Sequence, residues 1–258
     1  MYSMEGKRAI ITAASSGIGF SVATVLAESG AGVLMSSHNL EKIGQAAGML
    51  SERGLRAFPV RFDLEESDAG DLFAVASEKM NGADILIVNY GDPKLASFTD
   101  ISREDWDRYY RMFIGATTDL VRGFLKQVEG WGRIIFITSM TTRESYRGFA
   151  ISGALRAAVV NLGKTLSLEL GNQGITVNSI SQGYFMTERL QAVIQRNSAM
   201  NGTTFEEERK KITAEIPSGR IGKPEEIGYL VRFLCSDEAS YINGANIPID
   251  GGLTRYPY

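Results

Sequence analysis

Residues 12–19 combine small and hydroxyl side chains in a spacing that suits a phosphate group. Gly17 and Gly19 allow the backbone to approach a phosphate and a helix to approach a sheet, while Ser15 and Ser16 add hydroxyl donors. Free backbone amides at the start of a helix bind anions. A turn of small residues that binds nothing has a similar composition. The position of this turn, between the first expected strand and the first expected helix, favours a site for the pyrophosphate of a dinucleotide.

Strand-like and helix-like segments alternate along most of the chain. Apolar runs predict strands at residues 8–12, 33–36, 57–62, 84–89, 133–139, 175–180 and 245–249. Helical spacing and end signals predict helices at residues 18–29, 40–53, 68–80, 103–128 and 150–170, and one more that opens at Pro224. Strands joined by helical crossovers form a mostly parallel sheet. We therefore expect an α/β fold, a single Rossmann-type doubly wound domain over residues 1–258 with a seven-stranded sheet and helices on both faces.

Residues 187–216 interrupt this alternation with a polar, irregular pattern. Strand-like segments continue after them, so we expect helical pieces that form a substrate lid within the domain rather than a second domain.

Residues 102–105 read Ser-Arg-Glu-Asp, which predicts a capping box at the start of the 103–128 helix.

The composition argues against several classes of function. Hydrophobic residues make up 44% and charged residues 22%, as in an ordinary globular protein. A net charge of −3 without a basic stripe argues against a nucleic-acid partner, and the apolar runs are too short to cross a membrane. Cys235 and His38 are the only cysteine and histidine, so we expect no intrachain disulfide and no zinc site. We expect a cytoplasmic protein, because the first residues also lack a signal-peptide core.

The 12–19 turn is similar to the Thr-Gly-x-x-x-Gly-x-Gly cofactor motif of the short-chain dehydrogenase/reductase family, with Ala13 in place of the first glycine. This departure is mild unless the backbone there needs a positive φ. The resemblance covers essentially the whole chain. Residues 216–226 and 250–252 closely follow the C-terminal pattern of the family, and the chain is most similar to its 3-oxoacyl-acyl carrier protein reductase branch.

The resemblance implies a set of contacts to a nicotinamide dinucleotide. Asp63 matches the acid that holds the adenine ring, and Thr187 matches the residue that bonds the nicotinamide amide. Gly183 lies in a turn where Gln182 replaces the proline of the family. Together with the phosphate turn, the expected cofactor contacts are Ala13, Ser15, Ser16, Gly17, Ile18, Gly19, Ser37, His38, Asp63, Leu64, Asn89, Tyr90, Gly91, Arg156, Gly183, Phe185 and Thr187.

The end of the second expected strand bears on the choice between NADP and NAD. An acidic residue there would bond the ribose 2′-hydroxyl of NAD and repel the 2′-phosphate of NADP. The chain has Ser37 and His38 instead, and both can donate to a phosphate. Members of the family that use NADP often carry an arginine where His38 stands. We therefore expect NADP in preference to NAD, and the other interpretation is that His38 is an exposed loop residue.

The catalytic positions that the resemblance implies depart from the family pattern. Ser139 stands where a serine orients the substrate oxygen. Where the family has Tyr-x-x-x-Lys, the chain has Ser152 and Arg156, and the asparagine position of the long helix is Phe113. Serine has no accessible acidity at neutral pH, and a guanidinium stays protonated. We therefore expect a carbonyl that is held by Ser139, polarised by Ser152 and Arg156, and protonated by water.

Displaced tyrosines are the alternative source of a proton. Tyr146 lies six residues before Ser152, while Tyr184 and Tyr90 lie in other loops of the expected site. Each of the three is more typical of a packing or pocket-wall aromatic than of a relocated acid. Tyr146 is the strongest catalytic candidate among them.

Three functional hypotheses follow. The first is an NAD(P)-dependent oxidoreductase that acts on a small carbonyl or alcohol with an altered acid/base set; the preserved nucleotide and C-terminal patterns favour it. The second is a catalytically inactive dinucleotide-binding sensor or partner subunit, which the changes at Phe113, Ser152 and Arg156 favour. The third, a structural subunit without cofactor, has only weak support from Ala13 and Gln182. The resemblance also implies a homotetramer, formed through residues 103–128, residues 150–170 and the C-terminal strand.

Overall fold

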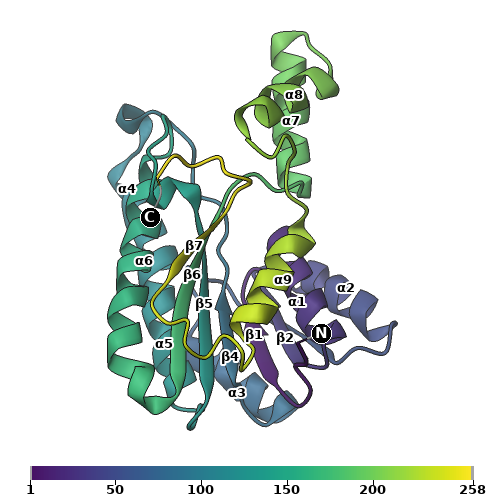
Figure 1. The fold of residues 1–258 in the computed structure, drawn as a ribbon, viewed down its shortest axis with the longest axis vertical. Helices are drawn as coiled ribbons and strands as arrows, with labels where there is room; N and C mark the ends of the chain where they lie inside the picture. Colours follow the sequence, from purple (N-terminus) through teal and green to yellow (C-terminus); the bar gives the residue numbers. More distant parts are fainter. Residues whose placement is uncertain (1, 257–258) are drawn as a thin grey trace.

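A seven-stranded sheet forms the centre of the computed structural model, which describes residues 2–256 (Figure 1). Its strand order is β3-β2-β1-β4-β5-β6-β7, and each neighbouring pair is parallel. The strands are β1 (Arg8–Ile11), β2 (Gly32–Ser37), β3 (Ala57–Arg61), β4 (Ile85–Val88), β5 (Gly132–Ser139), β6 (Ile175–Gln182) and β7 (Asn246–Ile249). The predicted fold class is confirmed.

Helices cover both faces of this sheet (Figure 1). They are α1 (Gly17–Glu28), α2 (Leu40–Ser51), α3 (Ala69–Met80), α4 (Arg103–Tyr110), α5 (Ala116–Leu125), α6 (Ala150–Leu170), α7 (Glu188–Asn201), α8 (Phe205–Glu215) and α9 (Pro224–Leu234). One core cluster joins the sheet to α1, α2 and α9, for example through Val22, Ile43 and Val231. A second cluster joins the other face to α3, α5 and α6. The five inner strands are buried on both faces, which explains why most of them read as continuous apolar runs, whereas the edge strands β3 and β7 are partly exposed.

The helix predicted over residues 103–128 differs from the observed one. It begins with the predicted capping box of Ser102 and Asp105, but a π-helical segment, η2 (Arg111–Gly115), separates α4 from α5. A π turn inserts one extra residue into the helical ladder, and apolar spacing does not reveal it. The helix also ends at Leu125 rather than near residue 128, because Lys126 and Gln127 already donate to carbonyls three residues back.

The sheet brings the ends of β4, β5 and β6 to one edge. Ser139, the last residue of β5, is in register with Gln182, the last of β6, and Val88 at the end of β4 is paired with Phe136 of β5. The strand order reverses between β1 and β4, and ligands of doubly wound folds bind in the crevice beyond that point. Residues 187–216 form α7 and α8, which project beyond this edge of the sheet (Figure 1). None of the helices within residues 2–256 is long and apolar enough to cross a membrane.

Close packing of α9 against α1 fixes the helix that follows the phosphate turn, and this contact can be tested. A Cβ on Gly228 of α9 would lie 2.7 Å from Cγ2 of Val25 and 3.1 Å from the carbonyl oxygen of Ser21. We expect Gly228→Ala to lower the free energy of unfolding by about 1–3 kcal/mol, measured by urea denaturation. Gly48→Ala in α2 is the matched control, because nothing lies within 4 Å of its Cβ position; it should stabilise the protein by about 0.5–1 kcal/mol. Equal midpoints for Gly228→Ala and wild type would contradict the close contact.

Candidate active site

A cavity of about 770 Å³ opens at the edge where β1, β4, β5 and β6 end. This volume is typical of ligand-binding cavities. Of the residues predicted from the sequence, the cavity is lined by Ala13, Ser15, Ser16, Gly17, Ile18, Ser37, His38, Asp63, Leu64, Asn89, Tyr90, Gly91, Ser139, Ser152, Arg156, Gly183, Phe185 and Thr187. Gly19 and Tyr146 are the two predicted site residues that do not line it.

The phosphate turn leads directly into the N-terminus of α1. Ser16 is the N-cap residue, yet its side chain makes no capping hydrogen bond, so its hydroxyl and the first amides of α1 remain available to a ligand. Gly17 has a φ of 56°, in the left-handed region. Gly19 does not line the cavity but allows the close approach of the turn to α1, because a Cβ there would lie 2.4 Å from the carbonyl oxygen of Ala13. The turn can therefore wrap closely around the helix end only with glycine at that position.

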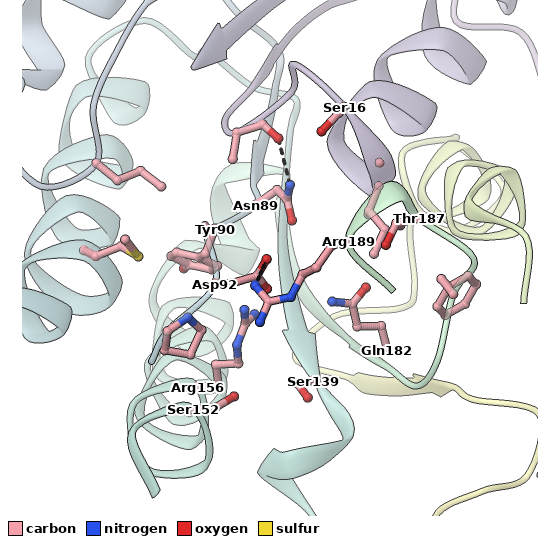
Figure 2. A pocket seen from close by; sticks show the side chains of 18 of the residues that line it. Ser16, Asn89, Tyr90, Asp92, Ser139, Ser152, Arg156, Gln182, Thr187 and Arg189 are labelled. Atoms are coloured by element: carbon pink, nitrogen blue, oxygen red, sulfur yellow. Dashed lines mark hydrogen bonds and ion pairs between the residues drawn. The ribbon is translucent and has the colours of Figure 1, made fainter. Parts of the chain in front are cut away.

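Ala13 also has a positive φ, 47°, so its replacement of the family glycine is not mild. A residue with a Cβ in the left-handed region costs about 1–2 kcal/mol. Hydrogen bonds hold it there: Nδ2 of Asn89 donates to the carbonyl oxygen of Ala13 at 3.1 Å (Figure 2). The hydroxyl of Thr12 donates to the carbonyl oxygen of Asn89 at 2.6 Å, and the amide of Asn89 donates to that hydroxyl at 3.0 Å. The ends of β1 and β4 are thereby clasped together.

The opposite side of the cavity is formed by the ends of β2 and β3. Ser37 is buried and its hydroxyl accepts a hydrogen bond from the amide of Asn39, while His38 is exposed. Asp63 lies in the wall, where Oδ1 accepts from the amide of Glu65 at 3.0 Å and shapes the turn. Arg61, at the end of β3, is in register beside Ser37. No acid stands at the end of β2.

The hydroxyls of Ser139 and Ser152 lie at the other end of the cavity, where β5 meets α6, and that of Thr141 lies next to Ser152. Ser139 ends β5, and its hydroxyl accepts from the amide of Thr141 at 3.3 Å. The hydroxyls of Thr141 and Ser152 are 3.2 Å apart, and Ser152 is 5% exposed. Ser152 and Arg156 lie one turn apart on the same side of α6, facing the cavity (Figure 2). The structure thus brings together the three catalytic positions Ser139, Ser152 and Arg156.

Arg156 is almost fully buried, with 4% of its surface exposed. Its Nη1 donates to the carbonyl oxygen of Ile137 in β5 at 3.0 Å, and Nε has no hydrogen-bond partner within residues 2–256. The guanidinium lies 4.9 Å from the ring centre of Phe113 and 5.6 Å from that of Tyr90. Burial lowers the pKa of Arg156 to about 10, so the group remains charged at neutral pH.

Tyr90 and Phe113 form an aromatic wall beside this guanidinium. Their ring centres are 4.8 Å apart, and Phe113 lies in the π-helical segment η2. The Tyr90 hydroxyl is 2.6 Å from that of Thr117, and burial raises the pKa of Tyr90. Tyr90 is thus engaged in packing and in one buried hydrogen bond.

Tyr146 lies in the loop before α6. Its hydroxyl donates to Oε2 of Glu144 at 3.3 Å, and burial together with this carboxylate raises the pKa of Tyr146 to about 12. A phenol with that pKa is a weak proton donor at neutral pH. Tyr184 does line the cavity, where burial raises its pKa as well.

Among the cavity residues that were not predicted, Asp92, Arg189 and Gln182 carry polar groups that bear on ligand binding. Asp92, after β4, and Arg189, on α7, form an ion pair across the cavity (Figure 2). Gln182 lines the wall with a buried Oε1 that has no partner within residues 2–256. The sequence held one signal for the ion pair. Asp92 and Arg189 have opposite charges and lie close in sequence to the predicted site residues Gly91 and Thr187.

The chain is similar to proteins of known name over nearly its full length. The family model described as "Enoyl-(Acyl carrier protein) reductase" matches residues 12–254. Gluconate 5-dehydrogenase of Gluconobacter oxydans is 32% identical in an alignment of 257 positions that covers 98% of this chain and 97% of that protein. The 3-oxoacyl-[acyl-carrier-protein] reductase of Aquifex aeolicus is 28% identical, over 97% of this chain and 98% of the relative.

Solved structures agree with the fold and with these relatives. L-Sorbose reductase from Gluconobacter frateurii, complexed with NADPH and L-sorbose, superimposes with a TM-score of 0.93 at 28% identity over 99% of both chains. A variant of actinorhodin polyketide ketoreductase with NADPH superimposes with a TM-score of 0.91 at 27% identity, over 99% of this chain and 100% of the other. With the parallel sheet, the phosphate turn and the position of Ser139, these matches show that the chain belongs to the short-chain dehydrogenase/reductase family.

Proposed function

We propose that the chain is an NADP-dependent oxidoreductase that transfers a hydride between the nicotinamide and a small carbonyl or alcohol substrate. One observation carries the proposal: a single cavity joins the phosphate turn at the start of α1 to Ser139, Ser152 and Arg156 at the end of β5 and on α6. The names of the relatives, which are dehydrogenases and reductases, and the NADPH in the solved neighbours support it.

The residues present fit a dinucleotide. The first amides of α1 and the uncommitted hydroxyl of Ser16 suit a pyrophosphate. A Cβ at Gly19 would collide with the carbonyl oxygen of Ala13, so the turn is shaped for backbone contact. Thr187 and Phe185 would lie against the nicotinamide, and Asp63 with Leu64 against the adenine. The cofactor, when bound, supplies or accepts the hydride.

We propose NADP rather than NAD on the charges around the end of β2. Ser37 and His38 line the cavity there, and Arg61 adds a positive charge beside Ser37 in the β2–β3 register. An acid that would repel a 2′-phosphate is missing from this strand end in the described chain.

In the proposed mechanism, hydroxyl groups and one fixed positive charge act on the substrate oxygen. Ser139 and Ser152 donate hydrogen bonds to the carbonyl oxygen, and the charge of Arg156 stabilises the alkoxide that develops there. Water supplies the proton, because neither the hydroxyls of Ser139 and Ser152 nor the charged guanidinium of Arg156 is a general acid at neutral pH. Phe113 fills the place from which an asparagine would hold a relay water, so the proton comes from the solvent side.

Residues 187–216 would act as a lid in this mechanism. Leu190 and Val193 of α7 line the cavity, and closing them over the substrate would exclude bulk water from hydride transfer. We also propose a homotetramer, supported by exposed apolar side chains on the helices that the resemblance implicates: Tyr110 on α4 and Leu168 on α6.

The cofactor choice is tested by titrating purified protein with NADPH and NADH and following nicotinamide fluorescence. We expect tighter binding of NADPH, and His38→Asp should weaken NADPH binding by roughly tenfold or more because it places a negative charge at the 2′-phosphate. Gln45→Asp adds the same charge on the exposed face of α2 and serves as the control. An unchanged NADPH-to-NADH ratio in His38→Asp would show that His38 does not face the phosphate. If neither NADPH nor NADH binds, the proposal that the chain is an oxidoreductase is refuted.

The role of Ser139 is tested by removing its hydroxyl. Ser139→Ala should lower kcat for carbonyl reduction by about 100-fold, since one hydrogen bond to the developing oxyanion is lost, with NADPH affinity unchanged. Ser139→Thr keeps a hydroxyl and should retain more activity. Ser240→Ala, on the exposed surface, is the control. Full activity in Ser139→Ala would remove this serine from the mechanism.

The pH profile tests the absence of a neutral-range general acid. The charged form of Arg156 is active and exists below its pKa of about 10. Carbonyl reduction should therefore stay level from about pH 6 to about pH 9 and fall as the pH rises through about 10. Arg156→Lys should move this fall to lower pH, since burial depresses the pKa of an ammonium group. A bell-shaped profile centred near neutrality would reveal a different titrating acid.

A further inference from the structure

The three arginines in the cavity wall differ in how their charges are balanced. Arg108 donates twice to the carboxylate of Glu65, at 2.7 and 2.9 Å. Arg189 pairs with Asp92. Arg156, the most deeply buried of the three, has no carboxylate partner within residues 2–256. The catalytic end of the cavity therefore holds an uncompensated positive charge.

Such a charge is costly to keep in a folded protein. The carbonyl oxygen of Ile137 and the rings of Phe113 and Tyr90 compensate for it in part, since aromatic faces attract cations. Nε has no acceptor within residues 2–256 and is itself buried, so a ligand meets only the part of the guanidinium that lines the cavity. A guanidinium in the wall of a ligand cavity that lacks an opposite charge from its own protein is suited to bind a negatively charged group of the ligand.

Two groups that take part in the proposed reaction do not balance the charge of Arg156. The ribose hydroxyls of a dinucleotide are neutral, so they offer hydrogen bonds but no opposite charge. The alkoxide is negative only during hydride transfer and does not compensate Arg156 in the resting complex. A permanent anion on the substrate would do so, and a carboxylate is the small anion that a guanidinium binds best.

Building on the proposed function, we infer that the substrate is a short oxo acid or the corresponding hydroxy acid, whose carboxylate pairs with Arg156. Ser152 and Arg156 are one helical turn apart and line the same cavity, so a substrate whose carbonyl oxygen lies at Ser139 and Ser152 would carry its carboxylate toward Arg156. The carbonyl carbon takes a hydride from the reduced nicotinamide, and its oxygen takes a proton from water. The oxo acid thereby becomes the hydroxy acid.

The rest of the substrate faces apolar side chains. The cavity wall includes five apolar side chains that a substrate could contact: Leu95, Met112, Phe149, Leu190 and Val193. Apolar walls favour a hydrocarbon chain over a hydroxylated one, because polar groups would lose hydrogen bonds to water there. The structure thus points to an oxo acid with an apolar side chain.

Binding is tested by calorimetry on protein saturated with NADP, using oxamate and its neutral analogue oxamide. Neither can be reduced, so the readout does not depend on turnover. We expect oxamate to bind far more tightly than oxamide, and Arg156→Gln to weaken oxamate binding by about 100-fold. Arg156→Lys should restore part of the affinity. Arg108→Gln, which removes an arginine already paired with Glu65, should leave oxamate binding unchanged. Equal binding of oxamate and oxamide by the wild type would overturn the inference.

Turnover with a matched pair separates this inference from the proposed function. The pair is 4-methyl-2-oxopentanoate and its methyl ester, which differ in the charge of one group. The wild type should prefer the acid in kcat/KM, and Arg156→Gln should lose that preference while NADPH still saturates it. Equal reduction of acid and ester by the wild type would refute the carboxylate contact but leave the oxidoreductase intact. Failure to bind either cofactor would refute the proposed function instead.

The melting temperature of ligand-free protein gives a second, independent readout. If the charge of Arg156 serves a ligand rather than the fold, then Arg156→Met should melt at the same or a higher temperature than the wild type. A melting temperature several degrees lower would make Arg156 a structural residue and overturn the inference.

Discussion

The clasp between the ends of β1 and β4 is the interaction on which the site depends. Thr12 and Asn89 exchange hydrogen bonds between side chain and backbone, and Asn89 also holds the carbonyl oxygen of Ala13. These bonds keep Ala13 in a backbone conformation that an alanine rarely adopts. Without them, the turn would relax away from the start of α1. The cavity exists where it does because two strands that are far apart in sequence are locked at the point where the sheet order reverses.

The departures from the family pattern form one cluster rather than separate losses. In sequence, Phe113 and Arg156 are unrelated changes, and Tyr90 lies in another loop. In the fold, the two rings lie against each other and the guanidinium lies beside both. Ser152, one turn away, lines the same cavity as the charge. A buried cation with aromatic neighbours is a consistent local environment, which differs in chemistry from a tyrosine–lysine pair and is better suited to fixed electrostatics than to proton transfer.

The sequence was sufficient for features that depend on local pattern. The strand bounds, the capping box at Ser102 and the cavity placement of most predicted site residues follow from apolar runs, end signals and motif order. It was insufficient where tertiary contacts decide the outcome. The positive φ of Ala13 is set by bonds from another strand, the π turn at Phe113 leaves no periodic signal, and the pairing of Asp92 with Arg189 depends on how a helix folds over a distant loop.

The ion pair of Asp92 and Arg189 has a kinetic consequence. It joins the loop after β4 to α7 in the cavity wall, so separating these two elements to widen the cavity would break it (Figure 2). Both side chains are about half exposed, and pairs of this kind are weak and screened by salt. Added salt would loosen the pair and speed the exchange of ligands, while it slows the long-range attraction of a charged ligand to the protein. Ionic strength therefore has two opposite effects on the rate of ligand binding: it loosens the ion pair at the cavity, and it weakens the attraction that brings a charged ligand there.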